Sequence, residues 1–200
     1  TPTFNTTYGL KINSIYFANA SGITEIANGT HNGKTITLTG NTAITSIGGN
    51  ITNSNVVCTS GNNHNITQNL TITGNGTTLT NCELDGNLIA NGTTLKLSGG
   101  SVDGNTTIAG NNTENGNDNN ISGVTFTGTV LVTGRYHEFK GGANTFKKTL
   151  TIENQDTLVD SNVFDISVND AYAIVTSDST NIGGLNISNN NFSEATGTAR

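Results

Sequence analysis

The chain has 200 residues, of which only 11% are charged, and its 8 Lys and Arg residues against 14 Asp and Glu give a formal charge of −6. Asn, Thr and Gly occupy 33, 36 and 25 positions, which is 94 of the 200. So few basic side chains cannot neutralise a phosphate backbone, so we expect no nucleic-acid binding. No apolar run reaches the ~18 residues of a membrane span. Abundant Thr, Asn and Gly with scarce helix formers favours strands joined by turns.

The first thirty residues contain four aromatic side chains and no clear repeat: Phe4, Tyr8, Tyr16 and Phe17. We predict that residues 1–30 form either a cap over the first repeat or an arm that docks on a neighbouring subunit by adding a strand to an exposed sheet edge. The chain opens with Thr1-Pro2 rather than Met, which is typical of a mature form cut from a precursor.

An 18-residue interval organises the middle of the chain. Residues 69–74 (NLTITG) recur as 87–92 (NLIANG) and 105–110 (NTTIAG), and looser copies begin at Thr35, Asn50, Thr129 and Thr149. Within each copy apolar and polar residues alternate, which is the period of a half-buried strand. The alternation predicts inward side chains at Leu70, Ile72, Leu88, Ala90, Val130, Val132, Leu150 and Ile152.

Each repeat is long enough for about three short strands separated by corners of Gly, Asn and Asp. We therefore predict an all-β fold, a right-handed parallel β-helix (solenoid) spanning residues 31–200. Its ~7–8 coils of ~18–20 residues would stack about 4.8 Å apart. The wholly polar segment 111–120 interrupts the period, and we expect it to form an exposed loop at one corner.

Four similar phrases end in Phe in the later half of the chain: 122–126 (SGVTF), 142–146 (GANTF), 160–164 (DSNVF) and 188–192 (SNNNF). With them the chain resembles the right-handed parallel β-helix repeats of the pectate-lyase-like superfamily, from about Thr35 to Phe192. The resemblance implies stacked coils in which Asn is followed by an inward Phe. It implies no single function, because that fold hosts lyases, hydrolases, adhesins and fibre proteins.

The two cysteines, Cys58 and Cys82, lie 8 and 13 residues after the starts of their repeats. This offset favours two buried thiols in different columns of the stack. A disulfide forms only if the corners of the two coils differ in length. No spacing of Cys and His is typical of a zinc site.

The end of the chain suggests assembly. Leu185, Ile187 and Phe192 predict one more coil, and only the eight residues 193–200 follow it. The end of a solenoid exposes an apolar cross-section and unpaired backbone groups, so it needs a cap or a partner. Residues 154–200 carry six acids against one Arg, whereas residues 1–34 carry two Lys against one Glu. Head-to-tail stacking of the chain on itself is therefore electrostatically tolerable, and such a contact gives a filament when it does not close.

Asn-X-Ser/Thr sequons recur along the chain, with little excess over what its composition predicts. In an exported protein they are acceptors for N-linked glycans. We expect the best acceptors in exposed loops and turns, at Asn28, Asn75, Asn91, Asn111, Asn120 and Asn191.

No catalytic constellation stands out, so we expect no enzyme and no cofactor apart from N-linked glycans. Asp85 and Asp103 repeat at 18 residues and are a weak candidate acid pair or cation site, although the Gly after each favours a turn. Glu114 and Asp118 in the polar segment are weak calcium candidates without a calcium-loop pattern. Arg135, His137, Glu138 and Lys140 form one dense polar cluster, with Lys147 and Lys148 one coil later, and a solvated face or subunit contact is its simplest interpretation.

The preferred interpretation is an extracellular or cell-surface structural protein, an N-glycosylated filament subunit whose partners are copies of itself, other surface proteins or glycans. The main alternative is a β-helix that binds or cleaves carbohydrate, with Asp85, Asp103 and the Arg135 cluster as its site. A third is an ice-binding solenoid, because the outward strand positions form a Thr-rich ladder: Thr37, Thr52, Thr71, Ile89, Thr107, Leu131 and Thr151.

Overall fold

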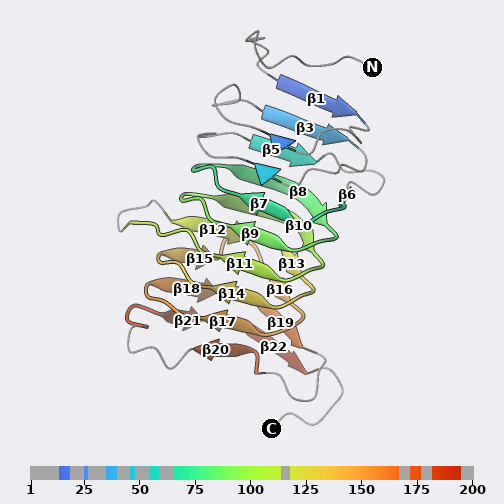
Figure 1. Ribbon diagram of the computed structural model, residues 1–200. Coiled ribbons are helices and arrows are strands. Elements are labelled where there is room, and N and C mark those ends of the chain that lie inside the picture. Colours follow the sequence, from blue (N-terminus) through green and yellow to red (C-terminus); the bar gives the residue numbers. More distant parts are fainter. Residues whose placement is uncertain are drawn as a thin grey trace.

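The computed structural model describes strands at 14–18, 25–26, 35–39, 46–47 and 55–58, and longer segments at 65–113, 118–166, 172–176 and 182–194. Within these ranges the fold is all-β, with no helix. The strands stack in parallel as a β-solenoid (Figure 1), which confirms the predicted fold. The described residues include no helix that is long and apolar enough to cross a membrane.

Two parallel sheets run along the rod. Sheet B has eight strands in chain order, namely β2 (Glu25–Ile26), β4 (Ser46–Ile47), β7 (Leu70–Ile72), β9 (Leu88–Ala90), β11 (Thr106–Ile108), β14 (Val130–Val132), β17 (Leu150–Ile152) and β20 (Ile174–Thr176). Sheet A has fourteen, along the path β1 (Ser14–Ala18), β3 (Thr35–Thr39), β5 (Asn55–Cys58), β8 (Thr78–Leu84), β10 (Lys96–Val102), β12 (Asn119–Ser122), β15 (His137–Phe139), β18 (Thr157–Asp160) and β21 (Asn186–Ser188). Beside that path sheet A continues with β6 (Asn65–Ile66), β13 (Thr125–Phe126), β16 (Thr145–Phe146), β19 (Val163–Ile166) and β22 (Asn191–Glu194).

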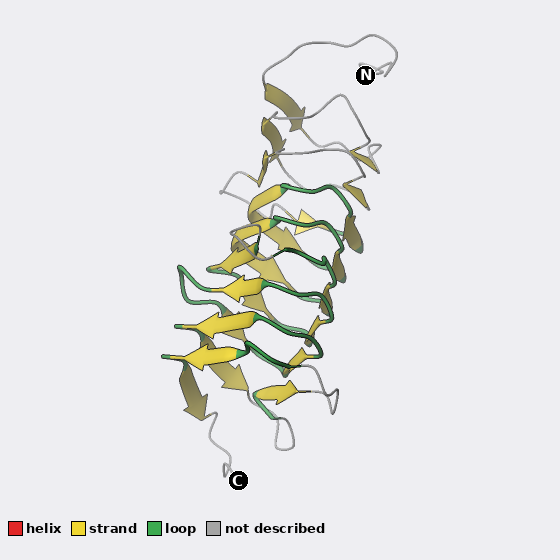
Figure 2. Ribbon diagram, turned by 90° about the vertical axis from the view of Figure 1, so that its left-hand side faces the viewer, coloured by secondary structure: helices red, strands yellow, loops and turns green. Residues whose placement is uncertain are grey.

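The solenoid has about five turns, fewer than the predicted seven or eight. These turns fill the continuous part of the structure, where successive coils lie one above the other (Figure 2). Strands β1 to β5 at one end and β20 to β22 at the other continue the same two sheets.

A corner divides sheet A within each coil. Strands β8 and β10 pass round it as single seven-residue strands, whereas later coils break there into separate pairs such as β12 and β13. The residues at the bend share a left-handed backbone: Asn81, Gly99, Gly123, Gly141, Ser161 and Asn189 have φ between 53° and 82°. Gly and Asn tolerate this conformation best, which explains much of their abundance.

The core is a set of columns in which each side chain stacks on the same position of the next coil. One column in sheet A runs through Val56, Leu79, Leu97, Ile121, Phe139 and Val159, all at most 5% exposed. All the inward positions predicted from residues 70 to 152 are buried. Phe126, Phe146, Phe164 and Phe192 form a second column with ring centroids 4.8–5.3 Å apart, as the Phe-ending phrases predict.

An asparagine ladder accompanies the Phe column inside the rod. The Oδ1 atom of Asn162 accepts from the backbone N–H and Nδ2 of Asn144, and the Oδ1 atom of Asn190 accepts from the same two groups of Asn162. The Nδ2 atom of Asn162 also donates to the Phe139 carbonyl at 2.9 Å. The amides therefore satisfy corner backbone groups that the strands leave unpaired.

Cys58 and Cys82 form a disulfide with Cα atoms 5.0 Å apart. The corners of the two coils differ in length, which is the condition under which the sequence predicts a disulfide. Cys58 directly follows Val57, which pairs with Thr80, whereas Cys82 comes two residues after Thr80. The extra residue is Asn81 at the left-handed bend, and it brings the two sulfur atoms together.

Two boundaries and one strand assignment differ from the prediction. Strands β1 and β2 already belong to the two sheets, so the solenoid begins before residue 31. Residues 119 and 120 belong to β12, and Asn112 and Asn119 are buried, so the 111–120 segment is not wholly exposed. The copy at Thr35 lies in sheet A, because β3 pairs with β5 rather than standing in the column of β7. The looser repeats in this part of the chain have unequal lengths, so their spacing does not show to which sheet a strand belongs.

We predict that Asn162→Leu lowers the free energy of unfolding by about 3 kcal/mol, because it removes the hydrogen-bond partner of the Asn144 N–H and of the Phe139 carbonyl in the interior. The matched control is Asn87→Ala on an exposed ladder, where the Oδ1 atom accepts only from the Asn105 N–H at 2.7 Å. Its loss costs about 1 kcal/mol or less. Urea titrations measure both, and equal losses would contradict a special role for the buried ladder.

Candidate functional site

The last described coil has exposed apolar side chains. Ile187 lies over Val159, which is fully buried, yet Ile187 is itself 44% exposed. Phe192 stacks on Phe164 at 5.0 Å and is 53% exposed, whereas the earlier rings of the column are at most 1% exposed. Leu185 is half-buried. The same inward columns that form the core are therefore open at this end.

Polar contacts attach the end coil to its neighbour. The Asp160 carboxylate accepts from the Ser188 hydroxyl at 2.7 Å and from Asn189 Nδ2 at 2.9 Å. These two donors, with Ser161, lower the pKa of the Asp160 carboxyl. The Asn190 amide donates to the Val159 carbonyl at 2.8 Å. The end coil is thus held in the register of the others.

Phe4 and Tyr8, predicted to act in assembly, lie outside the described residues. Tyr16 and Phe17 belong to β1, the outermost described strand of sheet A at the other end of the rod. The structure thus brings Leu185, Ile187 and Phe192 together and places Tyr16 and Phe17 at the opposite end (Figure 1).

The predicted polar cluster occupies the corner between sheet B and sheet A. Arg135 reaches the next coil, where its Nη2 atom donates to Gln155 Oε1 at 2.6 Å and lies 3.4 Å from Asp156 Oδ2. The Arg135 guanidinium also lies 5.4 Å from the centre of the Tyr136 ring. The corner therefore presents a guanidinium, an amide, a carboxylate and an aromatic ring side by side.

The backbone at this polar corner is left-handed. Thr94, Tyr136 and Asp156 have φ of 55°, 55° and 59°, and Gly76 and Gly184 have φ of 66° and 74°. Bulky residues rarely adopt this conformation, which costs roughly 1–2 kcal/mol each. The buried Asn112 supports it, because its Nδ2 atom donates to the carbonyls of Arg135 and Tyr136 at 3.2 and 3.0 Å. Sequence reasoning missed Asn112 and Tyr136, since nothing in the chain marks the corner position.

Two carboxyl groups meet beside the polar corner. Burial raises the pKa of Asp118, the neighbouring Glu138 raises it further, and Lys140 opposes the shift. The Lys140 Nζ atom donates to Glu138 Oε1 at 2.6 Å. Glu114 lies outside the described residues. The described part of the chain has no group of three or more side chains that could hold a metal ion, and calcium binding stays a prediction.

His137 is the buried member of the cluster, with no exposed surface. It points into the core in a column with Asn119 and Thr157, and its Nδ1 atom lies 3.4 Å from Asn112 Nδ2. Its Nε2 atom has no hydrogen-bond partner. Burial lowers the pKa of His137 to about 4, although the nearby Gly134 backbone opposes part of the shift. His137 is thus a neutral core residue and supplies no charge to the polar corner at neutral pH.

Asp85 and Asp103 stand in successive coils at another corner, because their backbone N–H groups bond to Ile66 and Leu84 of the coils before them. Both are exposed. The glycines that follow them have a steric role, since a Cβ on Gly104 would lie 2.5 Å from the Gly86 carbonyl carbon. The repeated Asp-Gly is therefore a turn.

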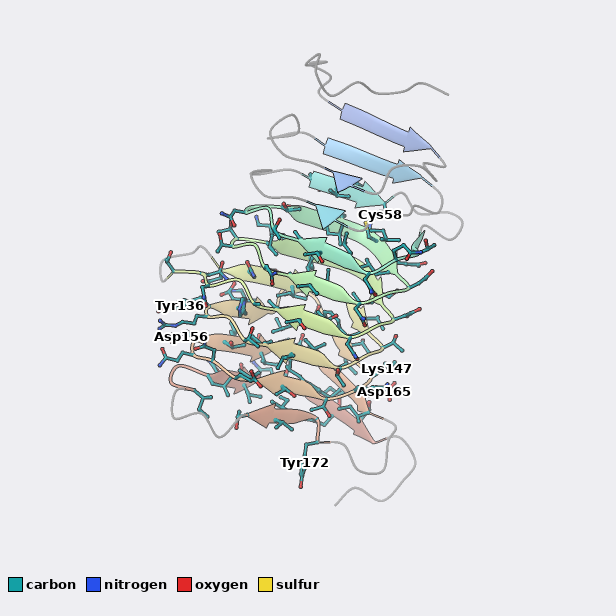
Figure 3. All side chains as sticks on the ribbon, in the orientation of Figure 1. Cys58, Tyr136, Lys147, Asp156, Asp165 and Tyr172 are labelled. Carbon is teal, nitrogen blue, oxygen red and sulfur yellow. A yellow bond between two sulfur atoms is a disulfide. The ribbon has the colours of Figure 1, made fainter. Side chains whose placement is uncertain are left out.

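Lys147 and Asp165 form an ion pair at the edge opposite Tyr136 and Asp156 (Figure 3).

The predicted Thr ladder is shorter than expected. Thr71, Ile89, Thr107, Leu131 and Thr151 do share a column on the outer face of sheet B. Thr37 instead lies in β3 of sheet A, Thr52 lies outside the described residues, and Ser46 is the residue paired with Thr71. Ile89 and Leu131 interrupt the column, and ice binding stays a prediction.

The predicted glycan acceptors differ in exposure. Asn75, Asn91, Asn111 and Asn191 are exposed, whereas Asn120 is half-buried in β12. Asn28 lies outside the described residues.

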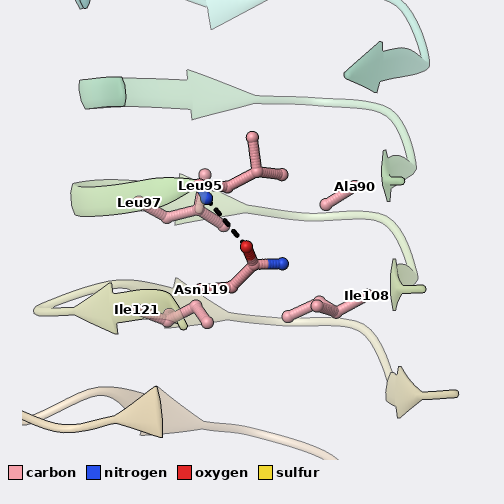
Figure 4. A pocket seen from close by; sticks show the side chains of 6 residues that line it. All are labelled: Ala90, Leu95, Leu97, Ile108, Asn119 and Ile121. Atoms are coloured by element: carbon pink, nitrogen blue, oxygen red, sulfur yellow. Dashed lines mark hydrogen bonds between the residues drawn. The ribbon is translucent and has the colours of Figure 1, made fainter. Parts of the chain in front are cut away.

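The interior of the rod offers no ligand cavity around Asn119. Figure 4 shows Asn119 between Leu95, Leu97, Ile121, Ala90 and Ile108, with its Oδ1 atom accepting from the Leu95 N–H at 2.7 Å. The space between these side chains has no room for a water molecule. The candidate sites described above all lie on the surface or in the last described coil.

No protein-family model, curated protein or solved structure matches the chain.

The buried His137 predicts acid sensitivity. The unfolded chain takes up a proton near pH 6.5, whereas the folded protein stays neutral down to about pH 4. The stability that this neutral side chain contributes is therefore present above pH 6.5 and lost as the pH falls to 4, by about 3 kcal/mol. We predict that the drop in unfolding free energy between pH 7 and pH 4 shrinks by this amount in His137→Leu, measured by urea titration. An unchanged pH dependence would contradict the assignment.

Proposed function

We propose that the protein is a structural subunit of an extracellular filament, built by head-to-tail stacking of β-solenoids. The observation that carries the proposal is the end coil, where Ile187 and Phe192 repeat the positions of buried core residues and are 44% and 53% exposed. The resemblance to the pectate-lyase-like superfamily belongs to the same proposal, since fibre proteins are among the proteins with that fold.

Register supports stacking of a second copy on this end. In the backbone register of sheet A, Ile187 occupies the same position as Val56 near the other end, and this register continues through Ile36 to Ile15 of β1. A second copy placed one coil beyond β21 brings its β1 alongside as a parallel strand, with Ile15 over Ile187. Sheet B has eight strands against nine on the path of sheet A, so the same displacement leaves one strand place open between β20 and β2 of the second copy. Strand addition supplies backbone hydrogen bonds, and the open columns supply apolar contact.

The contact uses different surfaces on the two copies. A heterologous contact of this kind propagates into a filament when its rotation does not close a ring. The uneven charge reduces repulsion, since residues 154–200 carry six acids against one Arg and residues 1–34 carry two Lys against one Glu. High salt therefore weakens the attraction between ends and leaves the apolar contribution in place.

The test is the double substitution Ile187→Lys and Phe192→Asp in the full chain. We expect the unsubstituted protein to form rods many subunits long in negative-stain electron microscopy, and the double variant to sediment as a monomer, because charge on the apolar columns blocks stacking. Ile89→Lys is the matched control, because Ile89 is also exposed, at 39%, but lies on the side of the rod. A monomeric unsubstituted protein at high concentration, or loss of rods in the control alone, would contradict the proposal.

A second candidate function is carbohydrate binding at the polar corner. The observation in its favour is the support of Arg135 by Gln155 and Asp156 next to the Tyr136 ring, because planar polar groups beside an aromatic ring suit a sugar. The adjoining Asp118 and Glu138 carboxyls would be the candidates for acid–base chemistry.

Binding of acidic and neutral oligosaccharides, measured by calorimetry, tests this candidate. We predict that Arg135→Ala reduces the affinity of any ligand found by about tenfold or more, since it removes charge-assisted hydrogen bonds. Lys147→Ala on the opposite edge is the control. Equal affinities of the two variants for the oligosaccharide would show that the polar corner is not the binding site.

A further inference from the structure

The outer face of sheet B is nearly free of charge. It consists of three columns, each running through the coils of β7, β9, β11, β14 and β17. The first is Asn69, Asn87, Asn105, Thr129 and Thr149; the second is Thr71, Ile89, Thr107, Leu131 and Thr151; the third is Thr73, Asn91, Ala109, Thr133 and Glu153. Glu153 is its one charged side chain. We call these fifteen residues the flat face.

Sequons gather on the flat face and along its border. Asn69, Asn91 and Asn105 belong to it, and Asn75 and Asn111 lie at the corner next to it. All five side chains are exposed. Of the sequon asparagines whose side chains are described between residues 66 and 166, Asn120 alone lies elsewhere, half-buried on sheet A between the partners Lys96 and Glu138.

The sequon asparagines on this side of the rod leave their reactive nitrogen unused. Asn69, Asn75 and Asn105 each accept a backbone N–H of the next coil through Oδ1, at 2.8, 2.9 and 3.1 Å. An N-linked glycan is attached to Nδ2 and leaves Oδ1 as an acceptor, so both can coexist.

Asparagines that use Nδ2 for the fold form a separate set. The described residues in which Nδ2 donates a hydrogen bond are Asn112, Asn119, Asn144, Asn154, Asn162, Asn189 and Asn190. None of these seven is followed by X-Ser/Thr. Among the described residues, the asparagines that use Nδ2 for the fold and the sequon asparagines are thus two separate sets.

The sequons also alternate along the first column and along the border. In the first column Asn69 and Asn105 are sequons and Asn87 between them is not; at the border Asn75 and Asn111 are sequons and Thr93 lies between them. Acceptors in one column are therefore two coils apart, about 10 Å, rather than about 5 Å. Two glycans fit at the larger spacing and collide at the smaller.

We propose that the flat face and its border carry N-linked glycans, at Asn69, Asn91 and Asn105 on the face and at Asn75 and Asn111 on the border. A glycosyltransferase supplies the sugar as an activated glycosyl diphosphate. The Nδ2 atom attacks the anomeric carbon, a C–N bond forms, the C–O bond to the diphosphate breaks, and Nδ2 loses one proton. The inference rests on the proposed function only in requiring export of the chain, not in requiring filaments.

The test is secretion of the full chain from a eukaryotic host, followed by mass spectrometry of glycopeptides from the folded, secreted protein. We expect glycans at the five sites in most molecules and a bare Asn120. Bare sites on the flat face, or a glycan on Asn120 in most molecules, would overturn the proposal. Electron microscopy of the same sample tests the filament separately. Glycosylated monomers would contradict the filament proposal and support the glycan proposal. Filaments without glycans would support the filament proposal and contradict the glycan proposal.

Two gain-of-sequon variants test the geometry. Ile89→Thr makes Asn87 a sequon between Asn69 and Asn105, and we expect that no molecule carries glycans on Asn87 and on either neighbour. Glu114→Thr makes the buried Asn112 a sequon, and we expect it to stay bare in the secreted protein. Molecules with a glycan on Asn87 together with one on Asn69 or Asn105, or with a glycan on Asn112, would overturn the proposal.

A loss-of-sequon variant keeps the ladder intact if Asn substitutions fail to fold. Thr71→Val and Thr107→Val remove the sequons at Asn69 and Asn105 and retain both Oδ1 acceptors. We expect loss of those two glycans, unchanged occupancy at Asn75, Asn91 and Asn111, and sheet–sheet association of the newly bare surface. Retention of the two glycans would contradict their assignment to Asn69 and Asn105.

Discussion

The close stacking of one coil on the next is the constraint on which the rest of the structure depends. Parallel strands bond at a fixed spacing of about 4.8 Å, so every position of a coil meets the same position of its neighbours. At the tightest corners only Gly fits, since a Cβ on Gly128 would lie 2.3 Å from the Gly104 carbonyl oxygen and one on Gly110 would lie 2.1 Å from that of Gly92. The high Gly content therefore follows from the stacking distance.

Stacking also divides the asparagines by position. Inside the rod they satisfy corner carbonyls and N–H groups, as Asn144 and Asn162 do, and a buried amide with a missing partner is costly. On the surface Asn69 and Asn87 cap the first N–H of the next coil through Oδ1 alone. The same residue type is thus structural in one column and chemically available in another, and only the register distinguishes the two.

The strict 18-residue interval between residues 69 and 110 was enough to predict the fold class, the inward positions and the Asp-Gly turns, because apolar alternation there is regular. The prediction failed where coils change length. Residue 35 was assigned to the wrong sheet, and the disulfide stayed open because the single left-handed residue Asn81 shifts Cys82 by one place. Asn112 and Tyr136 were missed at the polar corner for the same reason: Asn112 bonds to the carbonyl of Arg135, which lies 23 residues further along the chain rather than 18.

A solenoid that exposes both a flat side and an open end has two ways to associate, and only one of them gives a thin filament. The flat face has Glu153 as its one charged side chain, so little charge repulsion opposes contact between two such faces. The end coil lacks a cover over Ile187 and Phe192 among the described residues. Glycans on the flat face and its border would block contact through the side of the rod and leave its axis free, because they project away from β7, β9 and β11 rather than along the stack. Growth would then proceed along the axis alone, since the blocked surface and the open one are perpendicular.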